Sequence, residues 1–170
     1  MNAGAHGHAF WECVAGIRVV WPDGQINHLA AQAVKAGYRE VEGLEGAAIV
    51  EVTLRLHADE PEAIRARRQD FGARRVELEG LRTCGSLFKN PQGASAGATL
   101  DALGAKQWRV GGAYVFEKHA NIVIAGAEAT ASDLLALMLQ MRDVCSASRK
   151  ITLLPEVHGL PTTGAADAVH

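Results

Sequence analysis

Apolar segments of strand type take up most of the first third of the chain, and they restrict this part to a small β-sheet. Val14 to Trp21 is apolar, the turn Pro22-Asp23-Gly24 follows, and Gln25 to Leu29 resumes the pattern, which predicts a β-hairpin. Ala47 to Leu56 is rich in β-branched residues and leucine, and we predict a buried strand there. Ala30 to Ala36, between the two, is expected to form a short helix.

The rest of the chain mixes helical and extended patterns. Asp59-Glu60-Pro61-Glu62 is expected to begin a helix that runs to about Arg75, because acidic residues and proline favour a first turn. Another helix begins at Ala129-Thr130, and its core face is predicted from apolar residues spaced three to four apart: Leu134, Leu137, Met138, Met141 and Val144. The other expected elements are a loop at 80–91, a helix at 97–103 and strands at 108–110, 121–124 and 151–154.

Together these elements predict an α+β fold. We expect a β-rich piece at residues 1–58, a connecting helix within 59–79, a compact domain at 80–160 and a flexible tail at 161–170. A chain of 170 residues can bury about 70% of its unfolded surface, so no disulfide is needed for stability.

Composition narrows the function classes. The net charge is −2, so a polyanion partner such as nucleic acid is not indicated. The local basic run is interleaved with acids and is interpreted as a solvated helix face; it comprises Arg65, Arg67, Arg68, Arg74 and Arg75. Three widely spaced cysteines favour reduced thiols, and no apolar stretch reaches the length of a membrane span. We therefore expect a cytoplasmic protein with no membrane partner.

A polar loop holds the first candidate site. In Cys84-Gly85-Ser86-Leu87-Phe88-Lys89-Asn90-Pro91, the Ser86 hydroxyl, the Lys89 ammonium and the Asn90 amide could grip a phosphorylated or sugar ligand. The same residues would also suit an ordinary polar turn before Pro91. The loop is not Gly-x-Ser-x-Gly, so a hydrolase elbow is not indicated.

Two further charged residues are candidates. Glu156 follows the predicted strand at 151–154 and could be partly buried with a raised pKa, or it could be an exposed carboxylate at an edge. Arg39, after Gly37-Tyr38, could stabilise an anion, although a single arginine is more often a surface residue. The spacings of Cys84, Glu117 and His119 match no zinc pattern, so no metal site is expected.

Seven short motifs in order carry a resemblance to a known family. They are Asn2-Ala3-Gly4-Ala5, Gly37-Tyr38-Arg39, Gly85 to Pro91, Arg109-Val110-Gly111-Gly112-Ala113, Glu117-Lys118-His119-Ala120-Asn121, Ala129 to Asp133 and Pro155-Glu156-Val157. The set resembles the UDP-N-acetylenolpyruvoylglucosamine reductase (MurB) family over residues 1–160. The resemblance implies that residues 1–58 are a remnant of the second subdomain of a PCMH-type FAD-binding domain. It also implies that residues 80–160 are the α+β substrate-binding domain.

The family uses NADPH to reduce FAD, and the reduced flavin then reduces the enolpyruvyl ether of UDP-N-acetylglucosamine to UDP-N-acetylmuramate for the bacterial cell wall. By position in the motifs, the resemblance assigns the proton donor to Ser86 and stabilisation of the enol intermediate to Arg39 and Glu156. It assigns substrate contacts to Asn90, Lys89 and Tyr114, and the flavin cleft to Asn2, Ala3 and Gly4.

The sequence also departs from the family pattern. Val41 stands where a serine is usual, Tyr114 where a glutamine is usual, and Phe116 where a small polar residue is common. The chain also begins at the Asn-Ala-Gly loop, which in the family follows a half containing the glycine-rich loop for the FAD pyrophosphate. Without those backbone donors most of the flavin affinity should be lost.

Three hypotheses about activity therefore stay open. The first is one half of a split or truncated reductase that cannot hold FAD alone. The second is a non-catalytic fragment that binds a UDP-sugar without redox chemistry. The third is an unrelated hydrolase using Ser86, which is disfavoured because no base is paired with that serine in the motif.

Overall fold

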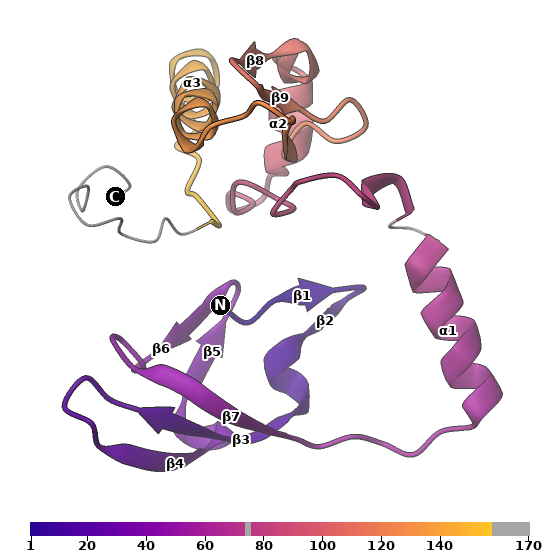
Figure 1. Ribbon diagram of the computed structural model, residues 1–170, viewed down its shortest axis with the longest axis vertical. Coiled ribbons are helices and arrows are strands. Elements are labelled where there is room, and N and C mark those ends of the chain that lie inside the picture. Colours follow the sequence, from indigo (N-terminus) through magenta and orange to yellow (C-terminus); the bar gives the residue numbers. More distant parts are fainter. Residues whose placement is uncertain (74–75, 158–170) are drawn as a thin grey trace. The chain divides into compact units, whose positions relative to one another are not determined.

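The computed structural model describes residues 1–73 and 76–157, and the chain divides into two compact units, Met1–Asp70 and Phe71–His170 (Figure 1). Each unit has its own hydrophobic core, and the fold mixes helices with short antiparallel sheets. The predicted tail at 161–170 lies outside the described residues, as do the two basic residues at 74 and 75.

A three-stranded antiparallel sheet forms the centre of the first unit. Its order is β4-β3-β7, with β3 at Val14–Val20, β4 at Ile26–Ala30 and β7 at Ala48–Leu54. The predicted hairpin is confirmed: Val20 pairs with Ile26, and the Trp21 N–H donates to the Gln25 carbonyl at 2.9 Å. Gly24 takes φ +83° in the turn, a conformation that favours glycine.

The predicted helix at 30–36 is wrong. Only a three-residue 3₁₀ turn, η2 at Ala31–Ala33, forms there. The strand β5, Lys35–Gly37, follows it and pairs with β6, Glu40–Glu42, so the hairpin takes the residues that a helix would have needed. An isolated segment this short cannot offset the cost of helix nucleation, so the pairing decides its structure.

The β7 strand was correctly predicted as extended but wrongly predicted as buried. All seven of its residues are exposed. The core of this unit consists of Val14, Ile17, Val19, Ala31 and Val34, and none of these comes from β7. Burial of a strand requires cover on its faces, and hydrophobic composition alone does not provide it.

The N-terminal segment and the basic helix complete this part of the chain. The β1 strand, Gly4–Ala5, pairs with β2, His8–Ala9, and a 3₁₀ turn, η1 at Phe10–Cys13, leads into β3. Helix α1 spans Pro61–Ala73 with no buried residue, close to the predicted range. Its arginines are exposed, and Arg67 pairs with Asp59, as expected for a solvated face.

The second unit is a small α+β domain. The η3 turn, Val76–Leu78, precedes it, followed by α2 at Ala96–Asp101, η4 at Ala105–Gln107, β8 at Arg109–Val110, β9 at Ala113–Val115, β10 at Val123–Ala125 and α3 at Ala131–Arg149. The sheet order is β10-β9-β8, all antiparallel. The sequence pattern missed β9, whose three residues follow the Gly111-Gly112 turn.

Helix α3 is the main element packed against the core of this unit. Thr130 caps it by accepting from the Asp133 N–H at 3.1 Å, and the Asp133 carboxylate accepts from the Thr130 N–H at 3.0 Å. The predicted face is confirmed at Leu137, Met138 and Met141, which are buried. Cys145 is also buried, whereas Leu134 and Val144 are only partly covered.

The predicted strand at 151–154 is wrong. The segment is extended, but its ladder consists of a single bridge between Phe88 and Pro155, supported by a Lys89 N–H donating to the Leu154 carbonyl at 2.8 Å. Its partner is itself a loop, so the pairing does not continue. Leu153 points into the core and is fully buried, while Leu154 is 60% exposed.

These neighbouring leucines provide a matched test of the core. We expect Leu153→Ala to lower the free energy of unfolding by about 2–5 kcal/mol, since a fully buried side chain leaves a cavity. Leu154→Ala should change it by less than about 0.5 kcal/mol. Urea unfolding followed by circular dichroism measures both, and equal losses would contradict the placement of this segment.

Candidate functional site

Ser86 lies in a segment that is fastened on both sides. On one side Ser86 bridges to Ile122, and the Leu87 N–H donates to the Asn121 carbonyl at 2.8 Å. On the other side the Glu156 N–H donates to the Leu87 carbonyl, also at 2.8 Å. The half-buried Ser86 therefore sits on a backbone whose position is fixed by two distant parts of the chain.

Asn121 is the residue that holds this segment most directly. Its Oδ1 accepts from the Phe88 N–H at 3.0 Å, and its Nδ2 donates to the Phe88 carbonyl at 2.8 Å. The amide thus satisfies both backbone groups of Phe88, as a neighbouring strand would. Asn121 is 3% exposed and is the one buried polar side chain among residues 1–73 and 76–157. The sequence placed it in a motif but did not single it out.

Glu156 belongs to the same neighbourhood as Ser86. Its backbone bond to Leu87 sets it beside the residue that follows the serine. Desolvation raises the pKa of the Cys84 thiol, and the negative charge of the Glu156 carboxylate raises this pKa further. Such an effect requires the carboxylate to lie near Cys84, so the structure brings Ser86 and Glu156 into one part of the second unit.

The three predicted substrate residues are also in the second unit. The Asn90 Oδ1 accepts from the Ala96 N–H at 3.0 Å, so this amide oxygen fixes the start of α2. Lys89 is half-buried and is anchored through its backbone to Leu154. Tyr114 lies on β9 between Arg109 and Ile124, with its side chain half-buried.

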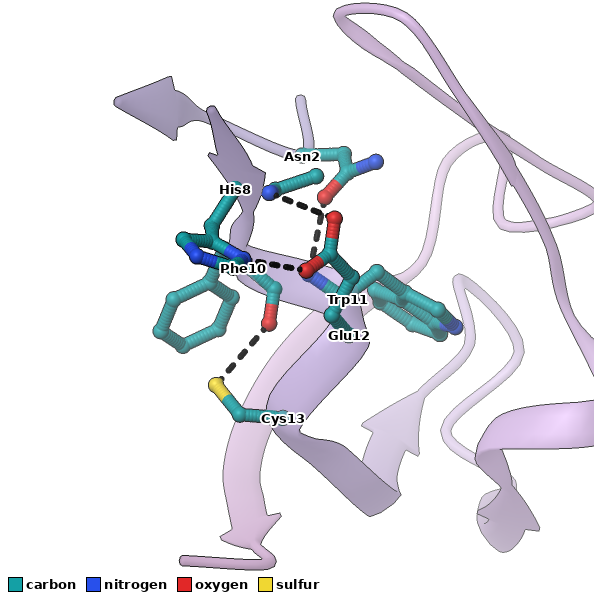
Figure 2. Close-up of polar contacts among 7 residues, drawn as sticks. Asn2, His8, Phe10, Trp11, Glu12 and Cys13 are labelled. Carbon is teal, nitrogen blue, oxygen red and sulfur yellow. Dashed lines mark hydrogen bonds and ion pairs between the residues drawn. The ribbon is translucent and has the colours of Figure 1, made fainter. Parts of the chain in front are cut away.

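A second cluster of predicted residues lies in the first unit. The Asn2 Oδ1 accepts from the Trp11 N–H at 2.8 Å (Figure 2). The Asn2 Nδ2 donates to the Gly37 carbonyl, also at 2.8 Å. The Asn2 side chain therefore joins the N-terminal loop to both η1 and the β5–β6 hairpin. The Ala3 carbonyl accepts from the Phe10 N–H at 2.8 Å.

Arg39 is held against the same loop. Its Nη2 donates to the Gly4 carbonyl at 3.2 Å, and its guanidinium lies 5.3 Å from the centroid of the Tyr38 ring. A Cβ atom at Gly4 would approach the Arg39 Nη1 to 2.9 Å, so a larger residue there would require the end of the arginine side chain to shift. Asn2, His6 and Arg39 all have positive φ, at 47°, 54° and 56°. Such a concentration of left-handed non-glycine residues is typical of functional loops.

Figure 2 also shows how the turn after this loop is closed. The Glu12 carboxylate accepts from the Ala9 N–H and lies 2.9 Å from the His8 Nδ1. The backbone bond from Ala9, and then the bond to His8, hold the pKa of the Glu12 carboxyl below its usual range. These contacts stabilise the loop that carries Asn2, Ala3 and Gly4.

The described residues do not by themselves fit the FAD pyrophosphate. Helix α1 begins beside carboxylates at 59, 60 and 62, which would repel a phosphate. The N-terminus of α3 carries the Asp133 carboxylate, which accepts from the N–H of the capping residue Thr130, and α2 has only six residues. In the two described ranges, no group of three His, Cys, Asp or Glu could hold a metal ion, and no helix there is long and apolar enough to cross a membrane.

Comparison with known proteins decides the family. The sequence model of the UDP-N-acetylenolpyruvoylglucosamine reductase C-terminal domain matches residues 76–160. The chain belongs to this reductase family. The α+β prediction is confirmed as well, because the fold matches the crystal structure of a UDP-N-acetylenolpyruvylglucosamine reductase (MurB) from Thermus caldophilus. That match has a TM-score of 0.82 at 27% identity and covers 95% of this chain and 58% of the other.

Curated relatives share the same region. The reductase of Alkalilimnicola ehrlichii is 36% identical over 160 residues, which cover 93% of this chain and 54% of the relative. That of Moorella thermoacetica is 38% identical over 159 residues, which cover 92% and 53%. The chain thus spans about half the length of the curated reductases that it matches.

The amide of Asn121 gives a direct test of the site's support. We expect Asn121→Ala to lower the free energy of unfolding by about 2–4 kcal/mol, because the Phe88 N–H and carbonyl lose their partner in a buried place. The exposed Gln92→Ala, in the loop before α2, should cost less than about 0.5 kcal/mol. Urea unfolding compares them, and an Asn121→Ala variant as stable as Gln92→Ala would show that the amide does not hold the Ser86 segment.

Proposed function

We propose that this chain supplies the substrate-side residues for the NADPH- and FAD-dependent reduction of UDP-N-acetylglucosamine enolpyruvate to UDP-N-acetylmuramate. This reaction provides a precursor for peptidoglycan. The proposal rests on membership of the reductase family, together with the fastened Ser86 segment in the second unit. We further propose that the reaction needs the half of the reductase that the matched relatives carry outside this region.

The chemistry requires two hydrogens to be added across the enolpyruvyl double bond. One arrives as hydride at the β-carbon, and a bound reduced flavin would supply it. The other arrives as a proton at the α-carbon, where negative charge develops, and we assign this proton to the Ser86 hydroxyl. A serine is a weak acid, so it donates only to a strong base such as a carbanion-like carbon held close to it.

Charge stabilisation is the second task, and we assign it to Arg39 and Glu156. A guanidinium can pair with the substrate carboxylate as it gains enolate character. We assign Glu156 to the same stage of the reaction. Asn90, Lys89 and Tyr114 are proposed to bind the UDP-sugar, while Asn2, Ala3 and Gly4 line the flavin side. The three free cysteines support a cytoplasmic location for this reaction.

A non-catalytic module that binds a UDP-sugar is the second candidate. The observation that favours it is the poor fit of the described residues to the FAD pyrophosphate. On this account Lys89 and Asn90 would still bind the ligand, but no reduction would follow. The two candidates differ in whether flavin is held once the half that the matched relatives carry outside this region is supplied.

Flavin retention separates these candidates. We expect the purified chain to be colourless after removal of unbound FAD, because the helix termini in the described part of the chain do not suit a pyrophosphate. Co-expression with the half of the Alkalilimnicola ehrlichii reductase that lies outside the match should yield a complex with the visible absorbance of bound flavin, since that half would add the backbone donors. Flavin bound by the chain alone would contradict the proposal that a second half is required. A colourless complex that still binds the UDP-sugar would favour the binding module.

Ser86→Ala tests the proton donor in the reconstituted enzyme. We expect flavin reduction by NADPH to be unchanged, while reoxidation of the flavin by substrate slows by about 10²–10⁴-fold, the usual contribution of a positioned acid. Ser146→Ala removes an exposed hydroxyl from α3 and should change neither step. Stopped-flow absorbance measures each half-reaction. If both half-reactions slowed equally in Ser86→Ala, Ser86 would not be the specific acid.

A further inference from the structure

Asn121, which holds the Ser86 segment, has a partner for each of its polar atoms. Its carbonyl accepts from the Leu87 N–H, and its side-chain amide pairs with both backbone groups of Phe88. The remaining polar atom is its backbone nitrogen, whose N–H donates to the His119 Nδ1 at 3.2 Å. Three of the four bonds thus lead to the residues directly after Ser86, and the fourth leads to the ring of His119.

The bond to Asn121 fixes the chemical state of the His119 ring. A backbone N–H can only donate, so the Nδ1 must accept and carries no proton. In a neutral ring the proton then lies on the Nε2. His119 is exposed as a whole, so its substitution leaves no cavity in the core, and its importance must come from this directed contact.

The same edge of the ring lies against helix α2. A Cβ atom built on Gly97 would lie 2.9 Å from the His119 Cε1, 3.5 Å from its Nε2 and 3.6 Å from its Nδ1. Gly97 is buried within α2, and it is this ring edge, with both nitrogens, that approaches its backbone. The absence of a side chain at Gly97 therefore leaves the room in which the ring can reach the Asn121 N–H.

These contacts form a closed path through the site. The Asn90 Oδ1 accepts from the first backbone N–H of α2, which fixes this helix to the loop that carries Ser86. From α2 the path continues through Gly97 to the His119 ring, and from the ring to Asn121. Asn121 returns it to the backbone just after Ser86. His119 is the link that joins the two ends.

We infer that His119 is a positioning residue for the proton transfer that we assign to Ser86, and the inference rests on that proposed function. By joining Asn121 to α2, the ring fixes the Ser86 hydroxyl relative to Asn90, the proposed ligand of the UDP-sugar. His119 acts through Asn121 rather than on the substrate. Proton transfer tolerates little displacement, since a shift of about 1 Å in a reacting group can slow a step by about 10²-fold.

Two replacements of His119 separate the roles of its ring nitrogens. The Oδ1 of asparagine takes the place of the Nδ1, whereas the Oε1 of glutamine takes that of the Nε2. In the reconstituted enzyme we expect His119→Gln and His119→Ala to slow flavin reoxidation by substrate about tenfold or more, and His119→Asn by less than about threefold. Flavin reduction by NADPH should be unchanged in all three. His57→Ala, which removes an exposed histidine from the first unit, is the matched control and should change neither step.

Gly97→Ala tests the same contact from the side of α2. Alanine suits a helix better than glycine, so the helix itself should not be weakened. Its Cβ would displace the ring from the Asn121 N–H, and we expect reoxidation to slow as it does in His119→Ala. When His119 is already alanine, Gly97→Ala should have no further effect, because the contact is gone. Independent, multiplying effects of the two substitutions would contradict the inference.

Nuclear magnetic resonance of the whole chain examines the contact without NADPH, FAD or substrate. In alkaline buffer the ¹⁵N shifts of His119 should show an unprotonated Nδ1 and a protonated Nε2. The amides of Leu87 and Phe88 should exchange about fivefold faster, or more, in His119→Ala and Gly97→Ala than in His57→Ala, because Asn121 has lost a partner. A protonated Nδ1, or equal exchange in the three variants, would overturn the inference.

The inference and the proposed function can fail separately. A reconstituted complex that reduces no substrate, while the amides exchange as expected, contradicts the reductase and leaves the contact of His119 supported. An active complex in which His119→Ala reoxidises normally contradicts the positioning role alone. Recovery of reoxidation by His119→Gln but not by His119→Asn would assign the exposed Nε2 to the substrate and would also overturn the inference.

Discussion

The pairing of the Asn121 amide with the Phe88 backbone is the interaction on which the second unit's site depends. The segment from Ser86 to Asn90 has no regular strand or helix to hold it. It is fixed instead by Asn121 on one side and by the backbone of 154–156 on the other. A buried amide that pairs with both the N–H and the carbonyl of one residue fixes a loop as a neighbouring strand would. Any shift of the loop would leave these polar groups buried and unpaired, with no water to replace the lost bonds.

The two units differ in how many hydrophobic residues they bury. The second encloses a core of fully buried residues, among them Phe88, Leu100, Leu137 and Met141. The first has only five buried core residues and leaves a hydrophobic strand at its edge uncovered.

Sequence reasoning succeeded where structure is decided locally. The hairpin around Gly24 and the capped helix α3 follow from turn chemistry and hydrophobic spacing, which neighbouring residues determine. It failed where distant partners decide. The sequence at 151–154 has the pattern of a strand, but the segment that it pairs with is a loop. The sequence of β7 has the pattern of a buried strand, but no other element in the described part of the chain covers its side chains. The role of Asn121 was invisible because its partner lies 33 residues away in the chain.

The candidate site was predicted only in part, for the same reason. Ordered motifs named Ser86, Arg39 and Glu156, and their roles stay proposals. Local spacing could not show that the Asn2 amide hydrogen-bonds to the backbones of Gly37 and Trp11 and thereby fixes the conformation of the loop. Nor could it show that the Arg39 guanidinium donates to the Gly4 carbonyl.

We propose that this chain takes part in the reduction only together with the half that the matched reductases carry outside the shared region. The most direct measurement is mass-spectrometric detection of UDP-N-acetylmuramate after incubation of NADPH, FAD and the enolpyruvyl substrate with this chain, with the other half, and with both. We expect product only when both halves are present together, and none from either half alone. Product from one half alone, or none from the assembled pair, would contradict it.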